Sequence, residues 1–157
     1  MNEILCFTVF GKPQPKQRPR FFRRGKFSGV YTPKETVAAE EAVKAAALSE
    51  KPKELITGEV DLSIVVFKET PKSFNKQQKH DAQMRLIRPT TKPDWDNYGK
   101  LVSDALNGFY WVDDGQIVTS LVMKFYAEKP CIIVTVRYNK NGGRLDDEYK
   151  GGVKIGS

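Results

Sequence analysis

The sequence predicts an α/β (α+β) domain in which a small mixed β-sheet is flanked by helices. Four runs rich in β-branched and aromatic residues read as strands, and two longer runs carry apolar residues at helical spacing. The strands are predicted at 4–10, 59–67, 117–126 and 131–138, and the helices at 34–48 and 95–107. A chain of 157 residues with 39% hydrophobic residues is long enough and apolar enough to fold as one domain.

The first helix is announced by its sequence. Thr32 can act as its N-cap, Pro33 fits the first helical position, and Glu35 lies where a capping box requires an acid. Between the first strand and this helix, residues 16–29 are basic, with Gly25 marking a turn.

The second half of the chain alternates helices, turns and strands. One short exposed helix is expected within 72–88, an extended segment at 89–93, and a turn at 113–115. In the helix over 95–107 the apolar stripe consists of Tyr98, Leu101, Val102 and Ala105. The last two strands are expected to form a hairpin through 127–130. We place the domain at 1–138 and a flexible, Gly-rich tail at 139–157.

Charge and cysteine content narrow the class of protein. Lys and Arg number 26 against 19 Asp and Glu, which leaves +7 and favours a polyanionic partner. Cys6 and Cys131 lie in apolar strands and are expected to be buried, reduced thiols. With one histidine, these exclude a disulfide scaffold, a structural zinc site and a cysteine hydrolase. No signal sequence or membrane helix is evident, so we expect a soluble cytoplasmic protein without membrane contact.

Acidic residues gather around the start of the second long helix. Asp94 and Asp96 flank Trp95, and Lys100 follows one helical turn later. If the turn at Asp113 and Asp114 folds back, one of its carboxylates meets this pair. Close carboxylates repel by about 4 kcal/mol at 4 Å, which a hard cation such as Mg²⁺ relieves. The alternative is structural, with Asp94 as an N-cap and Asp-Asp-Gly as an ordinary turn.

Two basic tracts precede this acidic cluster in the sequence. The first is interleaved with Phe21, Phe22 and Phe27, rings that can stack on bases or, alternatively, pack in the core. The second runs from Lys68 to Lys92 and contains His80, which we expect to be exposed. Trp95 and Trp111 are expected to pack, with DNA contact as a second role for Trp95. The cations assigned to DNA are Lys16, Arg18, Arg20, Arg23, Arg24, Lys76 and Lys92.

The central blocks resemble those of the RusA family of crossover-junction endodeoxyribonucleases. They read Asp94-Trp95-Asp96-Asn97-Tyr98-Gly99-Lys100, then Asp104-Ala105-Leu106, then Asp113-Asp114-Gly115-Gln116-Ile117. The N-terminal Gly11-Lys12-Pro13-Gln14-Pro15 and Tyr31-Thr32-Pro33 are similar to the arm of phage and prophage members.

This resemblance implies a homodimeric, Mg²⁺-requiring nuclease (with Mn²⁺ as a substitute) that resolves four-way Holliday junctions in DNA recombination and repair. It places the metal-binding carboxylates on Asp94, Asp96 and Asp114, the essential lysine on Lys100 and an auxiliary acid on Asp113. Two alternatives remain: a non-catalytic binder of branched or single-stranded DNA, and a nuclease acting on flaps, RNA or other branched DNA.

Overall fold

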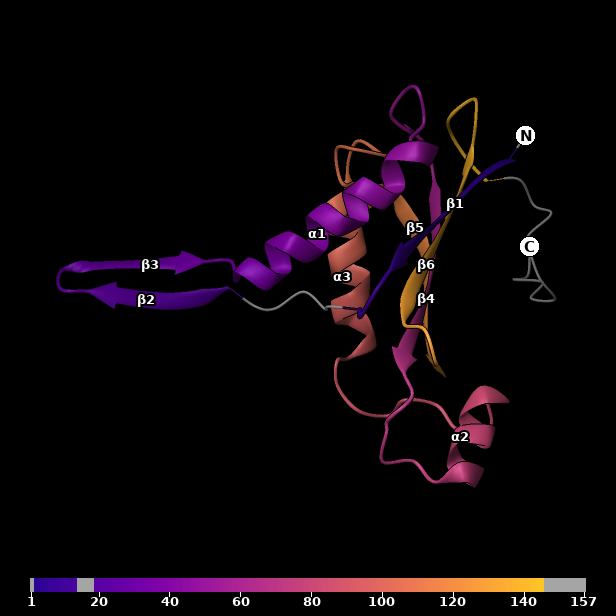
Figure 1. The fold of residues 1–157 in the computed structure, drawn as a ribbon. Coiled ribbons are helices and arrows are strands. Elements are labelled where there is room, and N and C mark those ends of the chain that lie inside the picture. The colour runs from indigo at the N-terminus through magenta and orange to yellow at the C-terminus, as the bar shows by residue number, and fades with distance from the viewer. Residues whose placement is uncertain (1, 14–18, 146–157) are drawn as a thin grey trace, which may run out of the picture.

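The computed structural model describes residues 2–13 and 19–145 (Figure 1). The elements in chain order are β1 (Asn2–Phe10), β2 (Arg20–Arg24), β3 (Phe27–Tyr31), α1 (Lys34–Ala47), η1 (Leu48–Glu50), β4 (Val60–Glu69), α2 (Lys76–Gln83), α3 (Trp95–Leu106), η2 (Asp114–Gln116), β5 (Ile117–Ala127) and β6 (Cys131–Asn139), where η marks a 3₁₀ turn. The predicted fold class is confirmed. None of the helices within these ranges is long and apolar enough to cross a membrane.

The main sheet is mixed and has the strand order β1-β6-β4-β5. β5 pairs parallel with β4, whereas β6 pairs antiparallel with both β4 and β1. The expected hairpin between the last two strands is therefore wrong. The segment containing α2 and α3 returns the chain to the starting end of β4, so β5 lies parallel on one side of β4. β6 then fills the antiparallel position on the other side.

The core lies between this sheet and two helices on one of its faces. Alternate β4 residues belong to the same buried cluster as Val43 of α1 and Leu101 of α3. The predicted stripe of α3 is confirmed, since all four of its residues are buried. The predicted capping box of α1 is wrong: Pro33 occupies the N-cap position and no side chain caps the helix.

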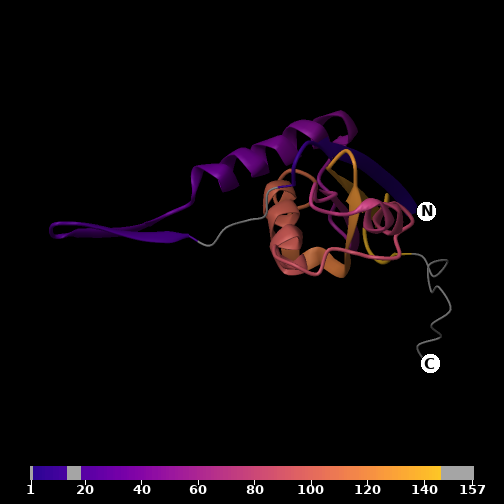
Figure 2. The ribbon, with the colours of Figure 1, turned by 60° about the horizontal axis from the view of Figure 1, so that its bottom comes forward.

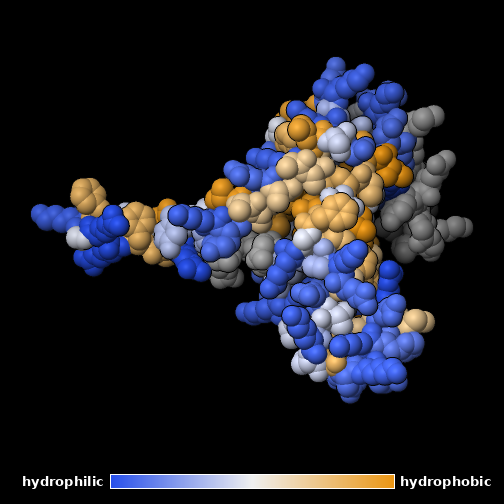
Figure 3. All heavy atoms as spheres, viewed as in Figure 1, coloured by the Kyte–Doolittle hydropathy of each residue, from blue (hydrophilic) through white to orange (hydrophobic). Residues whose placement is uncertain are grey.

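The basic stretch after β1 forms an arm that sequence patterning did not anticipate as strands. β2 and β3 pair as a separate two-stranded hairpin that projects away from the body (Figures 1 and 2). Gly25 occupies its turn with φ +56°, a left-handed conformation that favours glycine. The ring of Phe22 lies over Gly29, its cross-strand partner. Figure 3 shows apolar and charged residues alternating along this arm.

The sheet face opposite α1 and α3 explains a second difference. Cys6 is exposed there and Cys131 is half-buried, so the expected burial is wrong for Cys6, although both thiols are free as expected. Cys6 lies on this face because successive β1 side chains alternate, and Phe7 takes the core side.

Residues just after β6 are held against the start of β4. Glu59 accepts a bond from the Leu145 amide at 2.8 Å, and its own amide donates to the Gly143 carbonyl. The rest of the predicted tail, 146–157, lies outside the described residues. The domain boundary at residue 138 stays a prediction.

Candidate functional site

The first turn of α3 presents two exposed carboxylates. Asp94 occupies the N-cap position, yet its side chain makes no capping hydrogen bond. Asp96 lies within the first turn, where a negative charge is favoured by the helix dipole. The structural alternative for Asp94 therefore lacks its expected bond, and both carboxylates face solvent.

Two lysines hold the segment that leads into this turn. Lys124 of β5 donates to the Thr91 carbonyl at 2.9 Å and to the Pro93 carbonyl at 3.0 Å. Lys68 of β4 donates to the Lys92 carbonyl at 3.0 Å. Desolvation, followed by repulsion from Lys124 and Lys12, lowers the pKa of Lys68. These bonds fix the approach to Asp94 at the carboxyl ends of β4 and β5.

Sequence reasoning missed the role of Lys124 and assigned Lys68 only to a DNA-binding tract. The available signal was position: both lysines occupy core-side places in their strands, where Val66 and its neighbours are apolar. A lysine at such a place near a strand end needs a partner for its ammonium group.

Lys100 lies one turn along α3 from Asp96. It makes an ion pair with Asp104 at 3.1 Å rather than with Asp96. The Lys100 side chain is 62% exposed, so this pair contributes little stability and can be exchanged for another anion.

The turn at Asp113 and Asp114 lies at the opposite end of α3. Asp113 caps η2, accepting from the Gly115 amide at 2.9 Å, and so has a structural role. Asp114 accepts a hydrogen bond from the indole of Trp111 at 2.8 Å. Gln116 anchors the turn by donating to the Ile56 and Gly58 carbonyls, just before β4 begins.

One chain therefore does not bring the three predicted metal ligands together. α3 has 12 residues, which corresponds to about 18 Å between its ends. Asp94 and Asp96 lie at its start and Asp114 beyond its end. Within 2–13 and 19–145, no three His, Cys, Asp or Glu side chains are grouped so that they could hold a metal ion. The predicted fold-back of the turn does not occur in the single chain.

The two tryptophans differ in environment. Trp111 is fully buried and packs as expected, with its ring edge-on to Tyr110. Trp95 is 64% exposed between the two candidate ligands, so its expected packing is wrong. Its exposure beside Asp94 and Asp96 leaves the ring free to contact a ligand.

The predicted DNA-binding cations fall into three groups. Lys16 and Arg18 lie outside the described residues. Arg20, Arg23 and Arg24 are exposed on the arm, as are Phe21 at 86% and Phe27 at 79%, so these rings are not core residues. Lys76 on α2 and Lys92 before α3 are exposed near the body.

Other cations of the second tract serve the fold. Arg88 donates to the Lys124 carbonyl at 3.0 Å and lies 4.2 Å from the centre of the Phe125 ring. Arg85 stacks on the same ring at 4.9 Å. These contacts secure the 84–93 segment along the end of β5.

Exposed acidic residues at a helix start, together with exposed cations on the arm and on α2, are features expected of a metal-dependent nuclease. Residues 11–137 match the family described as Endodeoxyribonuclease RusA, and the chain belongs to that family. The nucleases of this family are metal-dependent. A relative from Bacillus subtilis (strain 168), the uncharacterized protein YqaN, is 41% identical over 138 residues, covering 86% of this chain and 96% of the relative.

Proposed function

We propose that this chain is a Mg²⁺-dependent endodeoxyribonuclease that resolves four-way DNA junctions as a homodimer, in recombination and repair. The observation that carries the proposal is the uncapped, exposed carboxylate pair Asp94 and Asp96 in a chain of the RusA family. The side-chain oxygen of an acid at a helix N-cap normally accepts a hydrogen bond from a backbone N–H of the first turn. Here that oxygen is available to a ligand.

The residues fit a hard divalent ion by the chemistry of their donors. Asp94, Asp96 and Asp114 supply carboxylate oxygens, the ligands that Mg²⁺ prefers. Asp114 is oriented by its bond from Trp111 and keeps lone pairs for a further partner. When bound, the ion would activate water and neutralise charge on the scissile phosphate.

The separation of the ligands along α3 supports a site shared between two chains. The start of α3 from one protomer and the η2 turn from its partner would complete each other. A two-fold axis would then generate two identical sites, matching the paired nicks that a four-way junction requires. The dimer is thus part of the chemistry in this proposal rather than an addition to it.

The chain's other residues take roles around this site. Lys100 would leave Asp104 to stabilise the negative charge that develops on the phosphate. Trp95 would lie against the DNA, and Asp113 would hold the η2 turn in shape. The arm, with Arg20, Arg23 and Arg24, would bind phosphates at a distance from the cut.

The experiment is nicking of a labelled synthetic four-way junction by wild type and Asp94→Asn, in Mg²⁺, Mn²⁺ or EDTA. A linear duplex and a flap of the same sequence serve as controls. We expect paired nicks on the junction that need the metal and disappear in the variant, while junction binding persists. Binding without cutting in either metal would favour a non-catalytic DNA-binding module, and cutting of the flap alone would change the substrate.

A further inference from the structure

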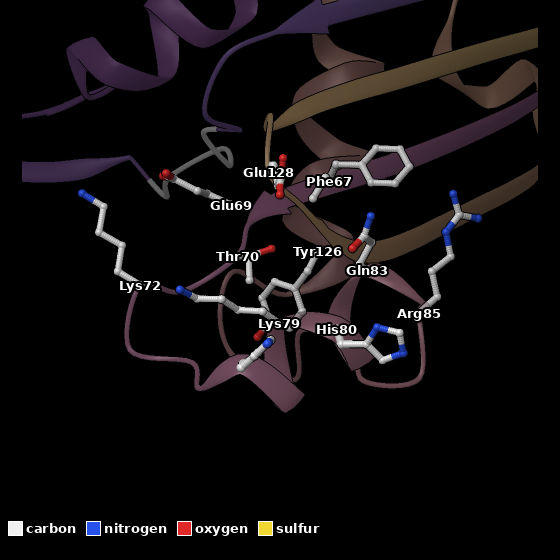
Figure 4. Close-up of a pocket in the computed structure, with 12 residues that line it drawn as sticks. Phe67, Glu69, Thr70, Lys72, Lys79, His80, Gln83, Arg85, Tyr126 and Glu128 are labelled. Carbon is white, nitrogen blue, oxygen red and sulfur yellow. The ribbon is translucent and has the colours of Figure 1, made fainter.

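A pocket of about 700 Å³ lies beside α2, at the carboxyl ends of β4 and β5 (Figures 1 and 4). Its wall is built from the ends of β4 and β5, the loop that follows β4, and α2. The polar and aromatic residues that matter here are Glu69, Lys72, Lys76, Lys79, Tyr126 and Glu128. A volume of this size falls in the range of sites that enclose a small ligand.

The charges of this pocket are separated rather than paired. Lys76 and Lys79 share one face of α2 because they are three residues apart, and Lys72 lies in the preceding loop. Glu69 and Glu128 come instead from the strand ends, across the pocket in Figure 4. No ion pair joins these lysines to these glutamates within the described part of the chain.

An aromatic ring lies between the two charged walls. Tyr126 is steadied by the ring of Phe74, which meets it edge-on at 5.4 Å between centroids. Figure 4 shows Tyr126 between Glu128 and the α2 residues Lys79 and His80. A base can stack on such a ring whatever its identity.

These three features together match one chemical class. A nucleotide carries a phosphate for the lysines, a flat base for Tyr126, and amino or imino hydrogens that a carboxylate can accept. With four cations from Lys72, Lys76, Lys79 and Arg85 against two carboxylates, the pocket is net positive by two. A purely anionic ligand would have no use for the two glutamates.

The pocket also lies next to the candidate catalytic turn. Tyr126 follows Lys124 by two places on the same face of β5, about 7 Å along the strand. Lys124 holds the Pro93 carbonyl immediately before Asp94. A nucleotide in the pocket would therefore belong to DNA close to the phosphate that is cut.

We infer that this pocket receives one unpaired nucleotide of the branched DNA. The inference rests on the proposed function for the source of that nucleotide. Capture of an unpaired base would favour DNA whose strands are already parted, as they are at a branch point, since removing a base from a duplex costs free energy.

The test places 2-aminopurine, whose emission reports stacking, at successive positions around the junction centre, with wild type in EDTA so that no strand is cut. A short single-stranded oligonucleotide carrying the probe runs in parallel. We expect a change of emission confined to one or two junction positions and present on the single strand. Tyr126→Leu should weaken binding of the oligonucleotide roughly five- to hundred-fold.

Lys79→Gln provides a second test if Tyr126→Leu fails to fold. Lys79 is exposed on α2, so its replacement should leave the fold intact. It should remove the emission change, whereas the matched variant Lys129→Gln, in the β5–β6 connection, should retain it. Wild type that cuts the junction with unchanged emission at every position would overturn the inference and leave the proposed function intact.

Probe signals on the single strand with no junction cutting would support the pocket and overturn the proposed function.

Competition with free dAMP is the last measurement. If dAMP displaces the oligonucleotide only at a large excess, the pocket is for nucleotides within a strand. Binding of dAMP that the oligonucleotide does not compete for would overturn the inference.

Discussion

The ammonium group of Lys124 lies 3.0 Å from the carbonyl oxygen of Pro93, and this bond joins the edge strand β5 to the start of α3. A second bond, to the Thr91 carbonyl at 2.9 Å, makes the attachment two-pronged. Asp94 follows Pro93 directly in the sequence. The position of the candidate carboxylates therefore depends on a lysine of β5 that lies outside the acidic motif. Lys124 is in this sense a positioning residue.

Lys124→Met keeps the aliphatic stem and removes both bonds. We expect a loss of about 1–2 kcal/mol in the free energy of unfolding. Junction cutting should fall further, up to about a hundred-fold, because small displacements of reacting groups are costly. Urea denaturation and nicking assays measure the two effects. Lys129→Met is the control, and equal cutting by both variants would contradict the positioning role.

The ion pair between Asp61 and Arg137 gives a prediction about stability. The two side chains, 6% and 13% exposed, meet at 2.9 Å on the sheet face opposite α1 and α3. Asp61→Ala leaves a largely buried guanidinium without this partner and should cost about 3 kcal/mol. Adding Arg137→Met should recover most of the loss in urea denaturation. If the double variant is as unstable as the single, the pair is not the source of the effect.

Local patterns accounted for most of the fold and little of the site. β4 and α3 were predictable because each carries an uninterrupted apolar stripe at its own period, and that stripe is what the core selects. The place of β6 between β1 and β4 was not, since strand order depends on where a crossover returns the chain. The arm was missed as a hairpin because its strands bury nothing, so no apolar alternation marks them.

The arrangement of the candidate site in space could not be predicted from local patterns, for a related reason. Asp94, Asp96 and Asp114 could be nominated from spacing, but their separation is set by the length of α3, which lies between them in the sequence. A helix cannot fold back on itself within 12 residues. The same motif that nominates the ligands therefore separates them in one chain.

Removing the hydroxyl group should lower the stability of the protein at Tyr110 but not at Tyr98. Tyr110 donates to the Ala47 carbonyl at 2.6 Å, whereas the Tyr98 hydroxyl is buried with no hydrogen-bond partner among the described residues. Tyr110→Phe should cost about 1 kcal/mol, and Tyr98→Phe should be neutral or stabilising. Thermal denaturation of the two variants provides the comparison, and equal losses would contradict this difference.

The burial of Tyr98 also predicts a loss of stability at alkaline pH. Burial raises the pKa of Tyr98 to about 12 from 10.0. The unfolded chain releases this proton near pH 10 while the folded chain retains it, so ionisation favours unfolding as pH rises between these values. Stability should therefore fall from pH 10 to 12, and less steeply in Tyr98→Phe. Urea midpoints at intervals across this range give the slopes; identical slopes would exclude Tyr98 as a contributor.

The arm should contribute to DNA affinity mainly through charge. Arg23, Arg24 and Lys26 are exposed at its tip, with no acid between Pro19 and Tyr31. If each binds one phosphate, replacing all three by Gln should make the negative slope of log K against log salt shallower by about three. Filter binding of a junction at several salt concentrations measures this. A changed affinity with an unchanged slope would mean that the arm acts through its aromatic rings.

A site shared between two chains makes a prediction that no single-chain site can meet. Asp94→Asn and Asp114→Asn should each be inactive, yet their mixture should regain cutting. In a mixed dimer one site carries both substitutions and the other carries neither. Half of the dimers in an equal mixture are mixed, so about a quarter of all sites are intact. Single nicks of the labelled junction count these sites directly.

Mixing Asp94→Asn with Asp96→Asn is the matched control and should stay inactive, because each site then contains one damaged carboxylate. If sedimentation shows mixed dimers of Asp94→Asn and Asp114→Asn but no nicking returns, the ligands do not come from different chains.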